Sequence, residues 1–159
     1  MCIVPKKYFL GFGLVEVLIG VSLVTVIGVY VGITVSQSVQ VRNEIIDNTN
    51  KVYLAEEGYE IIRLLRDENW SNLSSLSLNT PYHLQVATTT LAIGGSSEII
   101  DNKYSRNFLV QSVYRDGSGN IVASTTSGSA VDTDTLNIFV YVRDSNSTTS
   151  MQGILANFP

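Results

Sequence analysis

The chain contains one long apolar stretch near its N-terminus. Residues 12–35 read FGLVEVLIGVSLVTVIGVYVGITV, and Glu16 is the one charged residue among them. About 20 apolar residues in a helix cross the hydrocarbon core of a bilayer. The apolar run of a secretory signal peptide is shorter, at about 7–15 residues, and is followed by a small-residue cleavage site. The pattern therefore predicts a transmembrane helix over residues 12–35.

The helical pattern continues as an amphipathic segment over residues 36–72. No proline occurs between Pro5 and Pro81 to interrupt it. The apolar side chains that recur there at helical spacing are Ile45, Val52, Ala55, Tyr59 and Ile62. This spacing is typical of a helix with one buried face. We therefore expect a single helix from Phe12 to about Trp70, with Trp70 as a buried anchor at its end.

The remainder of the chain, residues 73–159, changes to Ser, Thr, Asn and Gly with short β-rich runs, which predicts a β-rich head. We expect strands near 82–86, 105–114, 136–143 and 150–156, and a long surface loop over 124–135. Alternating apolar positions that predict a half-buried sheet are Phe108, Val110, Val113, Leu136, Ile138, Val140 and Val142. The expected fold class is α+β, with the long helix, transmembrane in its first half, packed on an antiparallel sheet of about four strands.

Charge indicates an orientation in the membrane and a class of partner. Lys6 and Lys7 precede the apolar stretch, which puts the N-terminus in the cytoplasm and the head outside by the positive-inside tendency. The formal net charge is −4, and no basic stripe with interleaved aromatics occurs. We therefore expect a single-pass membrane protein with no direct sequence-specific contact to nucleic acid.

Little in the sequence points to catalysis or to a cofactor. Cys2 is the single cysteine and His83 the single histidine, and no nucleophile elbow, phosphate-binding loop or zinc spacing is present. Asp132 and Asp134, with Asp116, offer oxygen ligands for Ca²⁺, but their spacing does not match a calcium-binding loop. The alternative is that they are solvated loop acids. We expect no enzyme activity, no cofactor and no metal beyond that weak calcium candidate.

Glu16 is unusual because it lies within the apolar stretch. A carboxylate placed in lipid costs about 2.5–3.5 kcal/mol on insertion scales, so such residues usually have a partner and a role. Either its side chain reaches back to the interface from this end of the helix, or it has a specific partner. The residues around it favour the second interpretation.

The segment from Lys6 to Ile19, KKYFLGFGLVEVLI, resembles the leader and mature N-terminus of type IV pilins and of type II secretion pseudopilins. The resemblance implies a leader over residues 1–11, cleavage between Gly11 and Phe12 by a prepilin peptidase, and N-methylation of Phe12. It also implies that Glu16 pairs with the terminal amine of a neighbouring subunit. Expected partners are the prepilin peptidase, other pilin or pseudopilin subunits, an inner-membrane assembly platform and membrane lipid.

The helix also carries a pattern that favours close packing. Gly28 and Gly32 form a small-xxx-small pair, although incidental glycines in an apolar helix would look the same. The stretch lacks the proline that many major pilins carry, so a minor pilin or a pseudopilin is the expected subunit type, in a filament at the cell surface or in the periplasm. The alternative is a membrane-anchored extracellular adhesin that does not polymerise.

Overall fold

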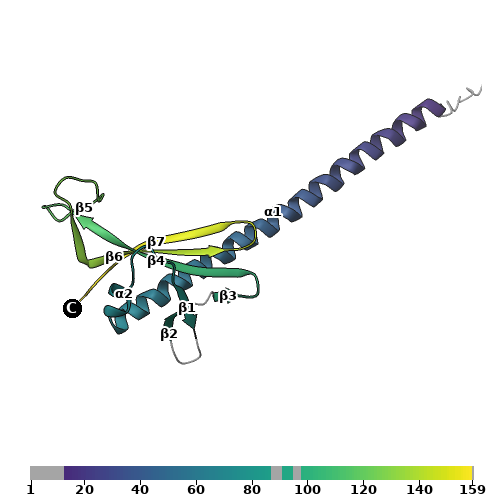
Figure 1. Ribbon diagram of the computed structural model, residues 1–159. Coiled ribbons are helices and arrows are strands. Elements are labelled where there is room, and N and C mark those ends of the chain that lie inside the picture. The colour runs from purple at the N-terminus through teal and green to yellow at the C-terminus, as the bar shows by residue number, and fades with distance from the viewer. Residues whose placement is uncertain (1–12, 87–90, 95–97, 159) are drawn as a thin grey trace, which may run out of the picture. The chain divides into compact units, whose positions relative to one another are not determined.

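The computed structural model describes residues 13–86, 91–94 and 98–158. Its long helix α1 (Leu14–Glu68) is followed by a short helix α2 (Ser71–Ser74) and by strands (Figure 1). The chain divides into two compact units between Ile45 and Ile46. We call the part from Ile46 onward the head unit. The predicted long helix is confirmed from Leu14 onward, and its expected first residue, Phe12, lies outside the described residues.

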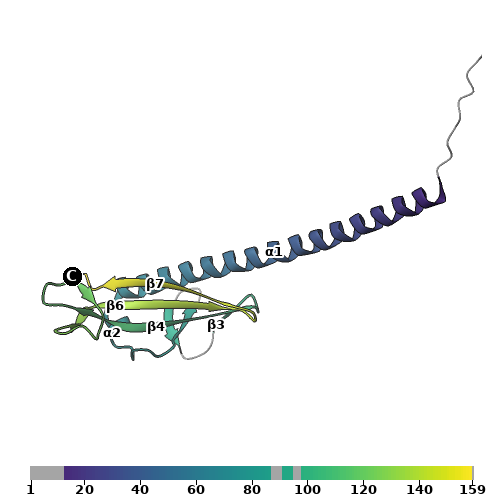
Figure 2. The same ribbon diagram turned by 90° about the horizontal axis from the view of Figure 1, so that it is seen from above.

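The head unit contains two antiparallel sheets. Its strands are β1 (His83–Val86), β2 (Leu91–Gly94), β3 (Glu98–Ile100), β4 (Tyr104–Arg115), β5 (Ile121–Val122), β6 (Ala130–Arg143) and β7 (Thr148–Ala156). β1 and β2 form a two-stranded sheet, whereas the larger sheet has the order β3-β4-β6-β7, with β5 also paired to β4. Figure 2 shows β4, β6 and β7 side by side. The α+β class and the antiparallel sheet agree with the prediction.

The predicted strands differ from the structure in two respects. The four expected strands correspond to β1, β4, β6 and β7, but β2, β3 and β5 were missed because runs of two to four residues carry too little alternation to read. The loop expected over 124–135 is wrong for its second half, because β6 begins at Ala130. A register shift between Ser112 and Val113 allows this polar segment to pair with the end of β4.

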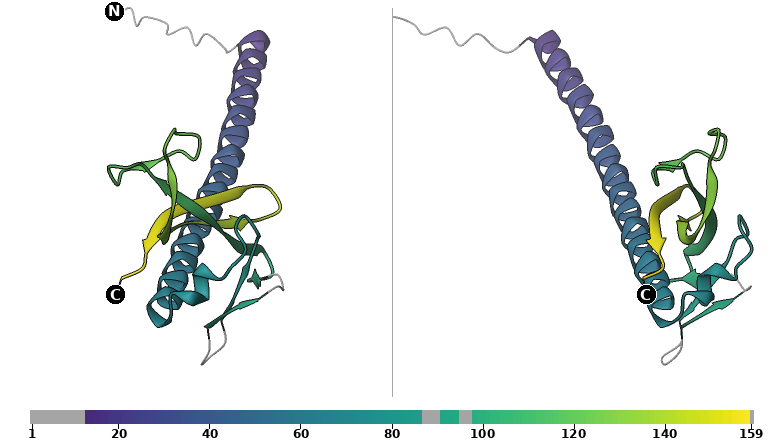
Figure 3. Two further views of the ribbon diagram at one scale, coloured as in Figure 1. Left: turned by 60° about the vertical axis from the view of Figure 1, so that its left-hand side comes forward. Right: turned by 90° about the vertical axis from the view of Figure 1, so that its left-hand side faces the viewer.

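The core of the head lies between the larger sheet and the second half of α1. All seven apolar sheet positions predicted from alternation are buried. On the helix Ala55 and Ile62 are buried and Tyr59 is half-buried, but Ile45 and Val52 are 59% and 45% exposed. Figure 3 shows the teal part of α1 alongside the sheet. The helix face that packs on the sheet is therefore rotated from the predicted one.

The predicted anchor at the end of α1 is only partly buried. Trp70 is half-buried and packs against the core cluster, next to the start of α2. Because it is the single tryptophan of the chain, its fluorescence reports on the packing of the head.

A glycine lets α1 approach the sheet closely. A Cβ built at Gly58 would lie 2.9 Å from Arg106 Cδ and 3.1 Å from Val140 Cγ1. Both neighbours belong to buried residues, so neither can move away easily. Gly58 is therefore a packing requirement at the centre of the helix–sheet interface.

We expect Gly58→Ala to destabilise the head by about 1–3 kcal/mol, the usual cost of overpacking, although alanine favours helix by about 1 kcal/mol over glycine. Urea unfolding of the full chain in detergent, followed by Trp70 fluorescence, measures the change. Gly28→Ala is the matched control, because a Cβ there would meet nothing within 4 Å. An unchanged midpoint for Gly58→Ala would show that the interface relaxes at no cost.

Candidate functional site

The first candidate is the exposed apolar half of α1. Every residue from 14 to 46 is exposed, and many of them are large hydrophobic residues such as Leu18, Ile27 and Val31. Within the part of the chain that the structure describes, α1 is long enough and apolar enough to cross a membrane. The span from Leu14 to Val35 is about 22 residues, or roughly 33 Å of helix, close to the thickness of a hydrocarbon core. Such a surface is compatible with a membrane span or with packing against other helices.

The serine and threonine hydroxyl groups of residues 14–35 are satisfied within the helix. Ser22 donates to the carbonyl of Ile19 at 2.8 Å, and Thr25 donates to the carbonyl of Val21 at 2.7 Å. Thr34 does the same toward Tyr30 at 2.9 Å. Because hydrocarbon offers no hydrogen-bond partners, internally bonded hydroxyls make the segment compatible with lipid.

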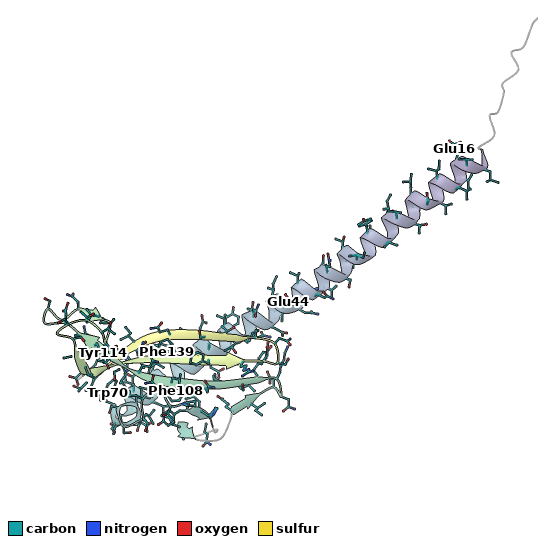
Figure 4. The ribbon with its side chains drawn as sticks, turned by 45° about the horizontal axis from the view of Figure 1, so that its top comes forward. Glu16, Glu44, Trp70, Phe108, Tyr114 and Phe139 are labelled. Carbon is teal, nitrogen blue, oxygen red and sulfur yellow. The ribbon has the colours of Figure 1, made fainter. Side chains whose placement is uncertain are left out.

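Glu16 lies in the first turn of α1 (Figure 4). Its backbone N–H donates to the carbonyl of Gly13 at 2.9 Å. A carboxylate in this position interacts favourably with the positive end of the helix dipole. No hydrogen bond or ion pair of its side chain occurs within the described part of the chain, and the next charged residue is Arg42. If this segment lies in lipid, the charge needs a partner from another molecule.

Two of the other predicted helix residues are open in the structure. Gly28 and Gly32 are one helical turn apart, and a Cβ at either would meet nothing within 4 Å. Their surface is therefore available to another helix, and their packing role stays a prediction. The predicted cleavage and methylation residues, Gly11 and Phe12, lie outside the described residues, as do Lys6 and Lys7 of the leader.

The calcium candidates lie at the register shift of β6. Asp132 Oδ2 accepts a hydrogen bond from Arg115 Nε at 2.5 Å, and its Oδ1 accepts the backbone N–H of Asp134 at 2.9 Å. Hydrogen bonds from Thr135 and Arg115 lower the pKa of Asp132 to about 2. The carboxylate is thus engaged in holding the shifted strand, and a cation would have to compete with Arg115 for it.

The remaining acid of that candidate set also has a local role. Asp116 accepts hydrogen bonds from the backbone N–H groups of Ser118 and Asn120, both at 2.9 Å, which closes the turn after β4. Among the residues that the structure describes, no group of three or more His, Cys, Asp or Glu side chains could hold a metal ion.

A buried ion pair in the head was not foreseen. Lys51 is 1% exposed, and its Nζ lies 3.0 Å from Asp144 Oδ2 and donates also to Ser147 Oγ. Asp144 Oδ1 accepts the backbone N–H groups of Asn146 and Ser147, both at 2.7 Å. The pair therefore ties α1 to the turn between β6 and β7. Lys51 lies one turn before buried Ala55, a spacing that could have placed it on the packed face.

The pair makes the head sensitive to acid. Hydrogen bonds from Lys51 and from the turn lower the pKa of Asp144 to about 2, from an ordinary value of 3.8. Because the pKa is lower in the folded state, the carboxylate contributes its full stabilisation above about pH 4 and loses it as the pH falls toward 2. We expect the stability gap between the native chain and Asp144→Asn to narrow over that interval, measured by urea midpoints. A stability difference that stays constant between pH 4 and pH 2 would contradict the lowered pKa of Asp144.

A second buried cation joins α1 to the larger sheet. Arg106 is 1% exposed and makes two parallel hydrogen bonds to Glu98, at 2.9 and 2.7 Å. Its Nη1 donates to the carbonyl of Leu54 on α1 at 2.9 Å. The partners of Lys51 and Arg106 all hold the helix, the sheet and their turns together. Neither cation therefore has a free donor group that could bind a ligand or take part in catalysis.

An open cleft of about 890 Å³ lies between the end of α1, α2 and the β1–β2 sheet. Its walls include Leu65, Leu76, Tyr82 and Ile93, and Glu68 is the one ionisable acid among the lining residues. A single exposed carboxylate without a histidine or second acid beside it forms no acid–base pair.

Comparisons with known proteins identify no relative. No family model, no curated protein and no solved structure matches this chain.

Proposed function

We propose that this chain is a structural subunit of a type IV pilus or of a type II secretion-like filament, either a minor pilin or a pseudopilin. The observation that carries the proposal is the exposed apolar stretch of α1 from Leu14 to Val35, with Glu16 as its one charge. The sequence before it adds a short basic leader that ends in Gly11-Phe12. A helix of this kind needs partners along its whole apolar surface, which either a bilayer or a bundle of like helices supplies.

In the proposed pathway, the chain is first inserted with its leader in the cytoplasm and its head outside. A prepilin peptidase then removes residues 1–11, and Phe12 becomes an N-methylated, positively charged chain end. The new amine pairs with Glu16 of a neighbouring subunit. Because an unpaired carboxylate in hydrocarbon costs about 2.5–3.5 kcal/mol, this pairing favours one axial register between subunits.

The test is the fate of the chain in cells that possess the assembly machinery. We expect the processed chain in filaments sheared from the cell surface or assembled in the periplasm, with a remainder in the membrane fraction. A chain that is processed but found only as isolated subunits in the membrane would contradict the proposal and favour a tethered adhesin. Carbonate extraction of the membranes checks insertion separately from assembly.

A further inference from the structure

The two edges of the larger sheet differ in how they are protected. The β3 edge is three residues long, and its Glu98 is bonded to Arg106. The β7 edge is nine residues long, TTSMQGILA, and contains no charged residue and no proline. Its pairing with β6 is in unbroken register, so no bulge twists it away. Short strands, charges, proline and bulges are the usual means by which sheet edges avoid further pairing, and β7 has none of them.

The hydrogen bonds at the two ends of the β6–β7 ladder show which backbone groups are free. The N–H of Asp144 donates to the carbonyl of Ser147 at 3.1 Å, and the N–H of Asn157 donates to the carbonyl of Asp134 at 2.8 Å. Bonded and non-bonded pairs alternate along an antiparallel ladder. Odd-numbered residues of β7 therefore bond to β6, and even-numbered residues such as Ser150 and Gln152 direct their N–H and C=O groups away from the sheet.

The free edge is open over its first half and closed near its end. The Tyr59 hydroxyl lies 3.5 Å from the carbonyl oxygen of Ile154, and a Cβ at Gly153 would overlap the Tyr59 ring. The helix therefore covers the edge at Ile154. From Thr148 to Gln152 the even-numbered side chains are exposed, and β7 pairs with no other described strand than β6.

We propose that the open half of β7 pairs antiparallel with the same segment of a second copy of this chain. In this arrangement Ser150 faces Ser150 of the other copy and Thr148 faces Gln152, which gives about six backbone hydrogen bonds between the copies. Two larger sheets are thereby joined edge to edge. This contact lies in the head unit and does not depend on the proposed helix assembly.

A second copy is favoured over another peptide because the segment is self-complementary. A twofold contact uses the same surface on both partners. Since β7 carries no charge, the two copies place no like charges opposite each other, which would oppose pairing. The segment equally offers no charge that would select an acidic or a basic partner.

Disulfide trapping tests the contact directly. We would place Ser150→Cys in a Cys2→Ser background and oxidise the full chain in lipid vesicles. The expected Cα–Cα distance of about 5.5 Å between bonded partners suits a disulfide. Asn107→Cys is the matched control, because Asn107 faces Tyr141, which faces Ser150, so it lies on the same sheet face two strands from the edge. We expect roughly tenfold more dimer for Ser150→Cys, since only this pair meets disulfide geometry.

A proline at the β7 edge distinguishes strand pairing from disulfides that form when two chains meet by chance. Gln152→Pro removes an N–H that β6 does not use, and edge strands accept proline in that orientation. Added to Ser150→Cys, it should lower the dimer yield to that of Asn107→Cys, whereas Gln152→Thr should leave the yield unchanged. Trp70 fluorescence verifies that each variant is folded. A Ser150→Cys yield equal to the control, or a yield that proline does not lower, would overturn the proposal.

Discussion

Replacing Lys51 with methionine is expected to destabilise the head by about 3–5 kcal/mol, the usual cost of removing one partner from a buried ion pair. Methionine retains most of the side-chain volume but leaves Asp144 buried without its cation. The carboxylate keeps two backbone N–H partners, but these alone do not offset the loss of the ammonium group. The urea midpoint of the full chain in detergent, read from Trp70 fluorescence, should fall accordingly.

The matched control removes both charges. In Lys51→Met with Asp144→Asn, the asparagine Oδ1 still accepts the N–H groups of Asn146 and Ser147, and no unpaired charge is buried. We therefore expect the double variant to regain most of the stability that Lys51→Met loses, as replaced buried ion pairs often do. If the two single losses simply added in the double variant, the pair would contribute no coupling and the account of this contact would be wrong.

Replacing Glu16 with glutamine is expected to prevent filament assembly while leaving membrane insertion intact. Glutamine has the same shape but cannot form an ion pair with a neighbouring amine. If that pair is buried between helices, its loss corresponds to about 3–5 kcal/mol, and each 1.4 kcal/mol is a factor of about ten. The amount of chain in the filament fraction should therefore fall by about a hundredfold or more, measured by immunoblot against the membrane fraction.

Glu44→Gln is the control for that experiment. Glu44 is another exposed glutamate on α1, beyond the apolar stretch (Figure 4), and its replacement should leave assembly unchanged. Normal filament yield from Glu16→Gln would remove the proposed role of the carboxylate. A loss of insertion rather than of assembly would also contradict it, because removal of a charge makes insertion easier.

The parts of the fold that could be read from the sequence are those with a sustained period. The alternation from Phe108 to Val113 and from Leu136 to Val142 identified the buried face of β4 and β6, and all seven positions are buried. The apolar run before Val35 identified the helix by length alone. In each case the pattern is long enough that the burial of apolar side chains, or their need for lipid, outweighs the local preferences of single residues.

The parts that were missed depend on contacts between distant residues. Lys51 and Asp144 are 93 positions apart, and a lysine on a helix is ordinarily solvated, so nothing local indicated their burial. The polar start of β6 is a strand because residues 130–132 pair with residues 113–115 of β4 beyond the register shift, where Arg115 also donates to Asp132. For Glu16 the reason is different, because its expected partner belongs to another copy of the chain.

Mass spectrometry of the mature N-terminus tests the central claim most directly. We expect a polypeptide that starts at Phe12 and carries one added methyl group, purified from cells that contain a prepilin peptidase. A chain that retains Met1 to Gly11 in such cells would contradict it, because no cationic chain end would then exist to neutralise Glu16 of the adjoining subunit.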